Sequence, residues 1–353
     1  MEKNEVTLKQ IAQEVGVSIT TVHRALNGKE GCSDELKERI FKVARDLGYS
    51  VNLAASSMRR KSLHFALLFP EYDKHTKYFI QKIKEGYLSY REDVSRFNIV
   101  FSEIYFNGDN YEQKLMDIYK DHPIRYDGLV MYALPTRFAA KMLNKLSGKG
   151  IHVVLLDREI PCADYTCCVK PNDIMSGKMA GEMLCKMTHK SGNVLILSTD
   201  YGTSIDGSFS DENCQSCMDE IARSRPDLSV EYLTLPTWNP DLNWLTEQLR
   251  QGKEYVAIYA TNARNTALMI SFLRENKQSN AMIAIGSDVF EQSITALKDG
   301  VLDLLIDKQP YQIGYKALKI LFSRVLKGEK CPHLMTIVPR IVLKSNLTND
   351  MEF

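Results

Sequence analysis

From residue 65 almost to its C-terminal end, the chain alternates short apolar segments with amphipathic helical ones, the first helix lying near residues 78–90. Such alternation predicts parallel β-sheets covered by helices. Roughly 290 residues exceed one hydrophobic core, so we expect two lobes. The apolar segments predicted as strands are 65–69, 99–104, 129–131, 153–156, 194–197, 256–259 and 283–285.

The first fifty residues have a different pattern, which predicts three short helices. Thr7 and Gln10 are spaced as a capping box at the start of the first helix, and Gly16 is a natural end for it. Ser18 can cap a second helix, and a third is expected to run from Ser33 to Gly48. Their apolar positions predict a shared small core, formed by Leu8, Ile11, Ala12, Val15, Val22, Ala25, Leu26, Leu36, Ile40, Val43, Ala44 and Leu47.

The outer face of the second helix carries Ile19, Thr20, His23, Arg24 and Asn27 at helical spacing. Short or hydrogen-bonding side chains of this kind can approach base edges and phosphates when a helix enters the DNA major groove. An ordinary solvated helix face is the alternative. The pattern therefore favours a helix-turn-helix DNA-binding unit.

Charge and composition agree with a folded DNA-binding protein. The chain has 353 residues, 44% of them apolar and 25% charged, with a net charge of +1. Residues 1–62 carry 11 Lys and Arg against 8 Asp and Glu, so positive charge gathers in the part expected to meet DNA. The first twenty residues lack the apolar core of a signal peptide, and we expect a cytoplasmic protein with no membrane partner.

The eight cysteines are scattered, which predicts reduced thiols rather than a disulfide framework. Cys214 and Cys217 form the CxxC sequence of the chain. A structural zinc site needs a second ligand pair at suitable spacing, and the sequence offers none. We therefore expect no metal and no cofactor, with these two thiols borne on a helix.

Several strings in the first sixty residues together closely resemble the headpiece of the LacI/GalR repressor family. They are TLKQIA at 7–12, GVS at 16–18, TV at 21–22, RALN at 24–27, LGY at 47–49 and, at the family's hinge helix, NLAASSM at 52–58. The resemblance implies a headpiece over residues 1–50, a hinge over 51–62 and a regulatory domain over 63–353.

That regulatory domain is implied to have the type 1 periplasmic-binding-protein fold, with two lobes and a ligand at the carboxyl ends of the strands. We expect the first lobe at about 63–160 and 291–325, and the second at about 161–290 and 326–345. The chain would then cross between the lobes near residues 160, 290 and 325.

The resemblance also assigns DNA-contacting positions. Ile19 and Thr20 take the places that discriminate operators, and Arg24 takes that of a base- and phosphate-contacting arginine. His23 and Met58 depart from the family's usual serine and minor-groove leucine, although methionine can still wedge into a base step. The full expected set is Ser18, Ile19, Thr20, Thr21, His23, Arg24, Asn27, Tyr49, Asn52, Ala55 and Met58. The basic run 59–61 would neutralise phosphates or form a basic linker.

Family positions likewise suggest effector contacts after the strands. They fall on Tyr78, Phe79, Asp157, Asn213, Asn262, Asp288 and Lys308. The alternatives are a helix cap for Asp288, core packing for Tyr78 and Phe79, and a surface position for Lys308. Asn213 and Lys308 depart from the family's frequent arginine and glutamine, and Lys308 suggests an anionic sugar acid as one possible ligand.

Together these features predict a homodimeric transcriptional repressor that binds double-stranded operator DNA under the control of a sugar or sugar derivative. A cytosolic sugar-binding protein or an enzyme of the same α/β fold is the alternative. The chain has no GxxxxGK[ST], GxGxxG, GxSxG or HExxH sequence, so catalysis is not expected.

Overall fold

The computed structural model describes residues 6–26, 31–47, 62–71, 77–120, 125–199, 211–235, 242–249, 254–276 and 282–348. The chain divides into two compact units, one comprising Met1–Ser62 with Arg96–Asn98 and the other the remaining residues. No described helix is long and apolar enough to cross a membrane.

The first unit contains three helices, as the sequence predicts. The amide of Thr7 donates to Gln10 Oε1 (2.7 Å), and Gly16 ends the first helix with a φ of 77°, in the left-handed region that glycine adopts without strain. The helices are α1 (Leu8–Val15), α2 (Ile19–Leu26) and α3 (Asp34–Asp46).

These helices share one small apolar core. Its fully buried members include Ile11 from α1, Val22 and Ala25 from α2, and Ile40 from α3. Leu47 was expected in this core, but it is exposed, because α3 ends at Asp46 and Leu47 follows the last helical turn. The remaining predicted core positions are buried or packed against the buried cluster.

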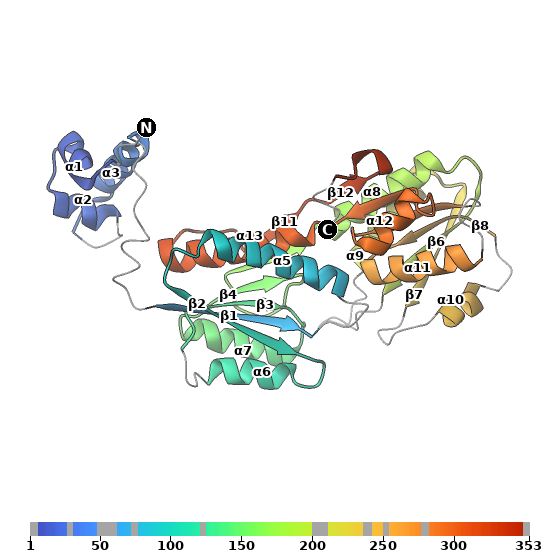
Figure 1. The fold of residues 1–353 in the computed structure, drawn as a ribbon, viewed down its shortest axis with the longest axis horizontal. Helices are drawn as coiled ribbons and strands as arrows, with labels where there is room; N and C mark the ends of the chain where they lie inside the picture. Colours follow the sequence, from blue (N-terminus) through green and yellow to red (C-terminus); the bar gives the residue numbers. More distant parts are fainter. Residues whose placement is uncertain are drawn as a thin grey trace. The chain divides into compact units, whose positions relative to one another are not determined.

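The second unit begins with a lobe built on a six-stranded sheet in which all neighbouring strands are parallel. Figure 1 shows α5 and α13 on one face of this sheet and α6 and α7 on the other. In spatial order the strands are β11 (Leu334–Ile337), β5 (Cys167–Pro171), β4 (His152–Leu156), β3 (Gly128–Tyr132), β1 (Leu63–Pro70) and β2 (Ile99–Phe106). The helices are α5 (Lys77–Asp93), α6 (Tyr111–Tyr119), α7 (Arg137–Gly148) and α13 (Pro310–Phe322).

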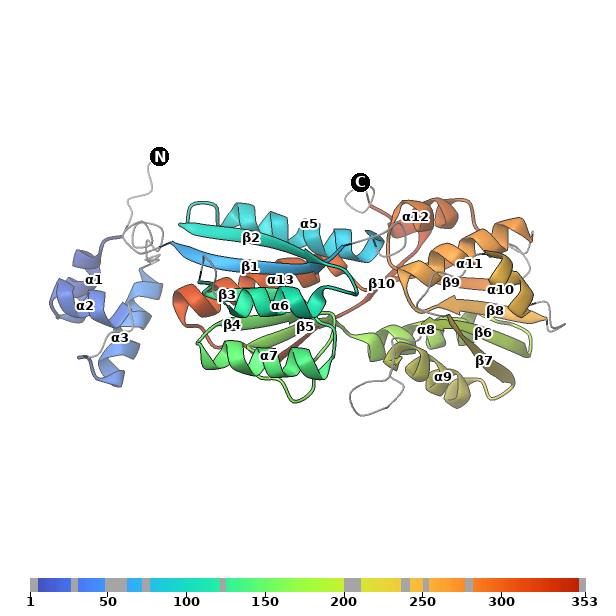
Figure 2. The ribbon, with the colours of Figure 1, turned by 90° about the horizontal axis from the view of Figure 1, so that it is seen from below.

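The second lobe repeats this plan. Helices α8 and α9 pack on one face of its sheet, and α10, α11 and α12 on the other (Figure 2). In spatial order the strands are β12 (Arg340–Val342), β10 (Leu304–Asp307), β9 (Ile283–Ser287), β8 (Tyr255–Ala260), β6 (Gly192–Thr199) and β7 (Leu228–Leu235), with β12 antiparallel to β10. The helices are α8 (Asp173–Met187), α9 (Glu212–Ser224), α10 (Leu242–Leu249), α11 (Ala263–Glu275) and α12 (Glu291–Lys298).

The lobe boundaries differ from those expected. The described chain changes lobe between β5 and α8, after β10, and between β11 and β12, which is near residues 172, 308 and 338 rather than 160, 290 and 325. The strands β5, β10 and β11 were absent from the predicted set. Each of them completes the sheet of the lobe that the chain is about to leave, so each crossing falls later than predicted.

Candidate functional site

The start of α2 is organised by two hydroxyl groups. The Thr21 amide donates to Ser18 Oγ (3.0 Å), and the Ser18 and Thr21 hydroxyls lie 2.8 Å apart. Ser18 thus caps the helix, which satisfies one of the amides left unpaired at a helix start. The capping also fixes the first turn, the part of a recognition helix that meets base edges.

The outer face of α2 is exposed in the way the sequence predicts. Ile19 is 48% exposed and Thr20, His23 and Arg24 are also exposed, whereas Val22 on the opposite face is fully buried. A large apolar side chain such as Ile19 at the first helical position is available for apolar contact with a base. Of the other expected DNA contacts, Asn27, Tyr49, Asn52, Ala55 and Met58 lie outside the described residues, as does the run 59–61.

A second cluster of polar residues forms where strands of the second lobe end. Thr199 closes β6, Thr261 follows β8, Asp288 follows β9 and Lys308 follows β10. Because the carboxyl ends of parallel strands meet at one edge of a sheet, these residues lie together. We call Thr261, Asp288, Lys308 and the residues that contact them the strand-end cluster.

Lys308 lies at the centre of the strand-end cluster and is only 6% exposed. Its Nζ donates to the Thr261 carbonyl (3.1 Å), lies 3.8 Å from Asp288 Oδ2 and lies 5.6 Å from the ring centroid of Phe79. The surface position considered for Lys308 is therefore wrong. Its charge is already balanced by the buried carboxylate of Asp288 and further stabilised by the cation–π contact with Phe79.

Asp288 is equally buried, at 2% exposure, and has a φ of 68°. Its Oδ1 accepts from the Lys308 amide (3.3 Å), while Oδ2 accepts no hydrogen bond from any described group. Burial raises the pKa of Asp288 to about 6, and the nearby Lys308 ammonium opposes that rise. The helix-cap alternative is wrong, because α12 is capped at Phe290 and the Asp288 carboxylate bonds to Lys308 instead.

The two aromatic residues at the start of α5 reach the second lobe. Tyr78 stacks on Phe290, which precedes α12, with ring centroids 4.2 Å apart and an interplanar angle of 23°. Phe79 lies beneath the Lys308 ammonium. Both side chains are half-buried, so neither is a simple core residue. They join the two lobes beside Asp288.

The amides of the two predicted asparagines are bound within the protein. Asn213 Nδ2 donates to the Thr261 carbonyl (3.2 Å), and its Oδ1 accepts from the Tyr259 hydroxyl (2.8 Å). Asn262 caps α11 by accepting from the Asn265 amide (3.0 Å), and it donates to Thr199 Oγ1 (2.9 Å). In this structure both residues hold the strand ends in place.

Asp157 supplies a carboxylate from the first lobe, directly after β4. Its Oδ2 accepts from the Tyr132 hydroxyl (2.7 Å) and lies 3.5 Å from Arg158 Nε. Its φ of 73° places it in the left-handed region, which is strained for a residue other than glycine. Such backbone strain is common at binding sites.

Two further acidic residues belong to this region and were not predicted. Asp211 caps α9 and accepts from the Ser198 hydroxyl (2.5 Å) and the Thr261 hydroxyl (3.2 Å). Asp173 is the first residue of α8 and is half-buried. Desolvation by the surrounding protein raises the pKa of Asp173 to about 6; the nearby charge of Lys308 lowers this pKa and that of Asp157 raises it. Asp173 lies two residues after the unpredicted strand β5, which is why its position near a strand end was missed.

The CxxC thiols lie inside α9. Both Cys214 and Cys217 are buried, and burial raises the pKa of Cys214 to about 12 and that of Cys217 well above its usual value. Metal ligation requires thiolates, which this environment disfavours. Among the described residues, no group of His, Cys, Asp and Glu side chains is placed to hold a metal ion.

Comparisons with known proteins agree with this division of the chain. Residues 7–52, which include α1, α2 and α3, match the bacterial regulatory proteins of the lacI family. Residues 79–330, most of the chain, match the periplasmic binding protein domain.

Individual relatives cover one or both parts. The chain is 23% identical to the HTH-type transcriptional repressor PurR of Histophilus somni over 97% of this chain and 98% of that protein. It is 25% identical to the ribose import binding protein RbsB of Salmonella typhimurium over 58% of this chain and 67% of that one.

Among solved structures, GanP, a glucose-galactose binding protein from Geobacillus stearothermophilus, has the same fold as the two-lobed unit. The TM-score is 0.66 at 19% identity, with 82% of this chain and 99% of GanP covered. The chain therefore belongs to the LacI family of bacterial transcriptional regulators, in which a helix-turn-helix domain precedes a periplasmic-binding-protein domain.

Proposed function

We propose that this regulator represses transcription by binding a near-palindromic operator as a homodimer, with α2 in the major groove. One helix-turn-helix reads only a few base pairs, so a specific site calls for two copies related by a two-fold axis. The exposed outer face of α2 supports this proposal. As a regulator of operator DNA, the protein would act in the cytoplasm.

We further propose that a small effector binds between the lobes, at the strand-end cluster, without being chemically changed. One observation carries this assignment: the buried Oδ2 of Asp288 accepts no hydrogen bond from any described group, although it lies in the interior. This oxygen lies 3.8 Å from Lys308 Nζ, an ion pair too long for a hydrogen bond. A buried oxygen that accepts no hydrogen bond is costly, and a ligand hydroxyl would donate one to it. The Tyr78 and Phe79 rings beside it would provide apolar surface for a sugar ring.

The charges of this region favour a neutral sugar or sugar derivative over a sugar acid. Lys308 suggested an acid from the sequence, but its ammonium is already paired with Asp288 and the Thr261 carbonyl. Asp157 and Asp173 add carboxylates nearby, whose influence reaches the same site. A ligand carboxylate would therefore meet more negative than positive charge. RbsB and GanP, whose names refer to ribose, glucose and galactose, are consistent with a neutral sugar.

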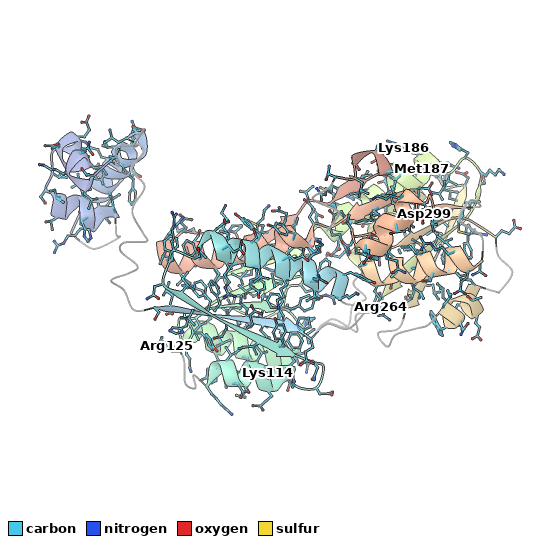
Figure 3. The ribbon with its side chains drawn as sticks, viewed as in Figure 1. Lys114, Arg125, Lys186, Met187, Arg264 and Asp299 are labelled. Atoms are coloured by element: carbon cyan, nitrogen blue, oxygen red, sulfur yellow. The ribbon has the colours of Figure 1, made fainter. Side chains whose placement is uncertain are left out.

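A thermal-shift screen of matched pairs, each a neutral sugar and its acid, tests the effector class. A ligand present at about 100 times its Kd should raise the unfolding free energy by roughly 2.7 kcal/mol. Stabilisation by an acid but not by its neutral counterpart would overturn the charge argument. Asp288→Asn should remove the stabilisation by the sugar. Asp299→Asn is the control: it also removes a carboxylate from the second lobe, at the end of α12 (Figure 3), and should preserve the stabilisation.

Operator control is tested by titrating the identified sugar against the full-length protein with and without DNA. The DNA would be selected by the protein from a random library, and we expect its consensus to be near-palindromic. Coupling between two sites is reciprocal, so an effector that alters operator affinity must bind the DNA complex with altered affinity by the same factor. Equal sugar affinity in both titrations would exclude control by that compound.

A further inference from the structure

A cavity of about 440 Å³ opens in the first lobe. It lies where the strands of the sheet begin, at the end opposite to their carboxyl ends. Its floor is formed by the first residues of β4 and by Thr166, which precedes β5. Arg125, which marks this edge in Figure 3, donates to the Lys149 carbonyl nearby (3.2 Å). The residues that line the cavity are Ser147, Gly150, Ile151, His152, Val153, Asp164, Tyr165, Thr166, Arg324, Lys330 and Cys331.

The walls of this cavity come from both helical layers of the lobe. Ser147 lies at the end of α7 on one face of the sheet, and Arg324 lies on the π-helical turn Ser323–Lys327 that extends α13 on the other. Tyr165 is stacked on His333 (ring centroids 4.2 Å apart), which fixes its ring in the wall. The cavity is therefore held by elements that are packed independently of any ligand.

The cavity carries two cations that have no ion-pair partner among the described carboxylates. Arg324 is half-buried and Lys330 is exposed. The carboxylate in the same cavity, that of Asp164, accepts from the Ser147 hydroxyl (2.5 Å) and from none of the described cations. The charged lining thus amounts to two positive groups against one negative group.

His152 completes the polar lining. Its Nδ1 lies 3.4 Å from the Thr166 hydroxyl, and its pKa is lowered, first by burial and then by the positive charge of Arg324. The other titratable or charged groups of the lining are Arg324, Lys330, Asp164, Tyr165 and Cys331. An anion placed between His152 and Arg324 would cancel the effect of the arginine, so the imidazole would gain a proton as the anion binds.

We propose that this cavity is a second binding site, distinct from the strand-end cluster, for the phosphate group of a small phosphate monoester. An arginine fork, a lysine, a protonatable imidazole and a hydroxyl are the groups that recognise phosphate. The cavity volume falls within the range of about 300–1,000 Å³ typical of small-molecule sites, so it has room beyond the phosphate itself. Ile151, Val153 and Tyr165, which border the cavity although each is at most 8% exposed, would lie next to the organic part.

Proton NMR of the histidine rings in the full-length protein provides the test, with inorganic phosphate as the first probe and chloride at equal ionic strength as the reference. His152→Gln identifies the His152 signal by its disappearance. We expect phosphate to raise the pKa of His152. An unchanged pKa at saturating phosphate would overturn the proposal.

Variants separate this site from general charge effects. Arg324→Gln should weaken phosphate binding about tenfold or more, since a charge-assisted contact is lost, and should by itself raise the pKa of His152. Arg125→Gln removes a cation from the same edge but not from the cavity lining, and should leave the affinity unchanged. Equal losses of phosphate affinity in the two variants would show that phosphate binding depends only on the overall charge of the protein.

A second probe distinguishes the source of the phosphate group. Glycerol 3-phosphate carries the same group on a small organic part and should bind more tightly than inorganic phosphate if the apolar wall contributes. Equal affinity for the two would exclude the monoester and leave free phosphate as the ligand. Binding of either probe that persists in the doubly substituted Arg324→Gln, Lys330→Gln protein would place the anion elsewhere.

Discussion

Asp157 and Asp288 occupy equivalent positions in the two lobes. Each follows the third strand in the spatial order of its sheet, β4 in one and β9 in the other, and each has a left-handed φ, of 73° and 68°. Their amides donate to the neighbouring strand in the same way, to the Val169 carbonyl (3.0 Å) and the Ile306 carbonyl (2.9 Å). The two lobes thus have an aspartate with the same strained backbone conformation at the same position of the sheet.

This equivalence explains why acidic groups gather between the lobes. Each sheet presents an aspartate at the carboxyl end of the same strand, and the influence of both Asp157 and Lys308 on the pKa of Asp173 shows that the groups lie close enough to interact. Backbone strain of this kind costs on the order of 1–3 kcal/mol and is retained mainly at functional positions. The strain therefore supports an effector role for both aspartates.

The raised pKa of Asp288 predicts a pH-dependent stability. Its folded-state pKa of about 6 exceeds the ordinary value of 3.8, so the folded protein binds more protons than the unfolded chain between these values. The contribution of Asp288 to the unfolding free energy is therefore highest below the ordinary value and is lost as pH rises through about 6. Chemical denaturation of the native protein and Asp288→Asn from pH 4 to 7 should show the native protein losing stability relative to the variant. A constant difference would contradict the buried, perturbed carboxylate.

The stack of Tyr78 on Phe290 predicts a contribution to effector binding, because it joins the lobes beside Asp288. An aromatic pair contributes about 0.5–1.5 kcal/mol beyond its buried area, so Tyr78→Ala should weaken binding of the effector by about twofold to tenfold. Phe290→Ala should have a similar effect, and the double variant should lose less than the sum. Tyr311→Ala, whose ring stacks only within the first lobe on Tyr315, is the control and should bind normally. If the losses of effector affinity in the two single variants add up in the double variant, the Tyr78–Phe290 contact itself contributes nothing to binding.

Much of this architecture can be predicted from residue patterns. The caps of α1 and α2 follow from local hydrogen bonding by Thr7, Gln10 and Ser18, which needs no tertiary context. The seven predicted strands are present. Six of them contain short apolar runs that are largely buried, whereas β2 contains Ser102 and Glu103, lies at the edge of its sheet and is mostly half-buried. The position of Asp288 at the carboxyl end of a strand follows from the predicted strand 283–285.

Other features could not be predicted because they depend on long-range packing. Strands β5 and β10 are only five and four residues long and give no periodic signal, so the lobe crossings and Asp173 were misplaced or missed. The pairing of Lys308 with Asp288 depends on a fold that buries both side chains, whereas a lysine in sequence is most often at the surface. The phosphate cavity combines residues from Ser147 to Cys331, which no local pattern connects.

The exposed face of α2 predicts separate effects for two substitutions. Arg24→Ala should weaken operator binding by about 1–3 kcal/mol through loss of a charge-assisted contact, whereas substitution of Thr20 should change the preferred sequence. Effector affinity should be unchanged in both, because the strand-end cluster lies in a different unit. Fluorescence anisotropy at fixed salt measures the affinities, with Arg39→Ala, an exposed arginine on α3, as the control. Unchanged operator affinity in Arg24→Ala would remove Arg24 from the DNA-reading face.

The crossing of α5 and α13 predicts a strict need for glycine at two positions. A Cβ atom on Gly86 would lie 1.9 Å from the Tyr311 carbonyl oxygen, and one on Gly314 would lie 1.9 Å from the Ile83 carbonyl oxygen. Both obstacles are backbone atoms, so either alanine substitution must push the helices apart. Overpacking of this kind typically costs about 1–3 kcal/mol of unfolding free energy.

The same crossing sets the geometry of the strand-end cluster, because Phe79 lies near the start of α5 and Lys308 lies two residues before α13. Gly86→Ala should therefore lower both the unfolding free energy and the effector affinity, as measured by chemical denaturation and calorimetric titration. Gly148→Ala is the matched control, since a Cβ there meets nothing within 4 Å. Gly148→Ala should leave both quantities nearly unchanged or raise the unfolding free energy slightly, because alanine gives the unfolded chain less conformational entropy than glycine does. Equal stability of Gly86→Ala and Gly148→Ala would mean that the two helices do not approach as closely as described.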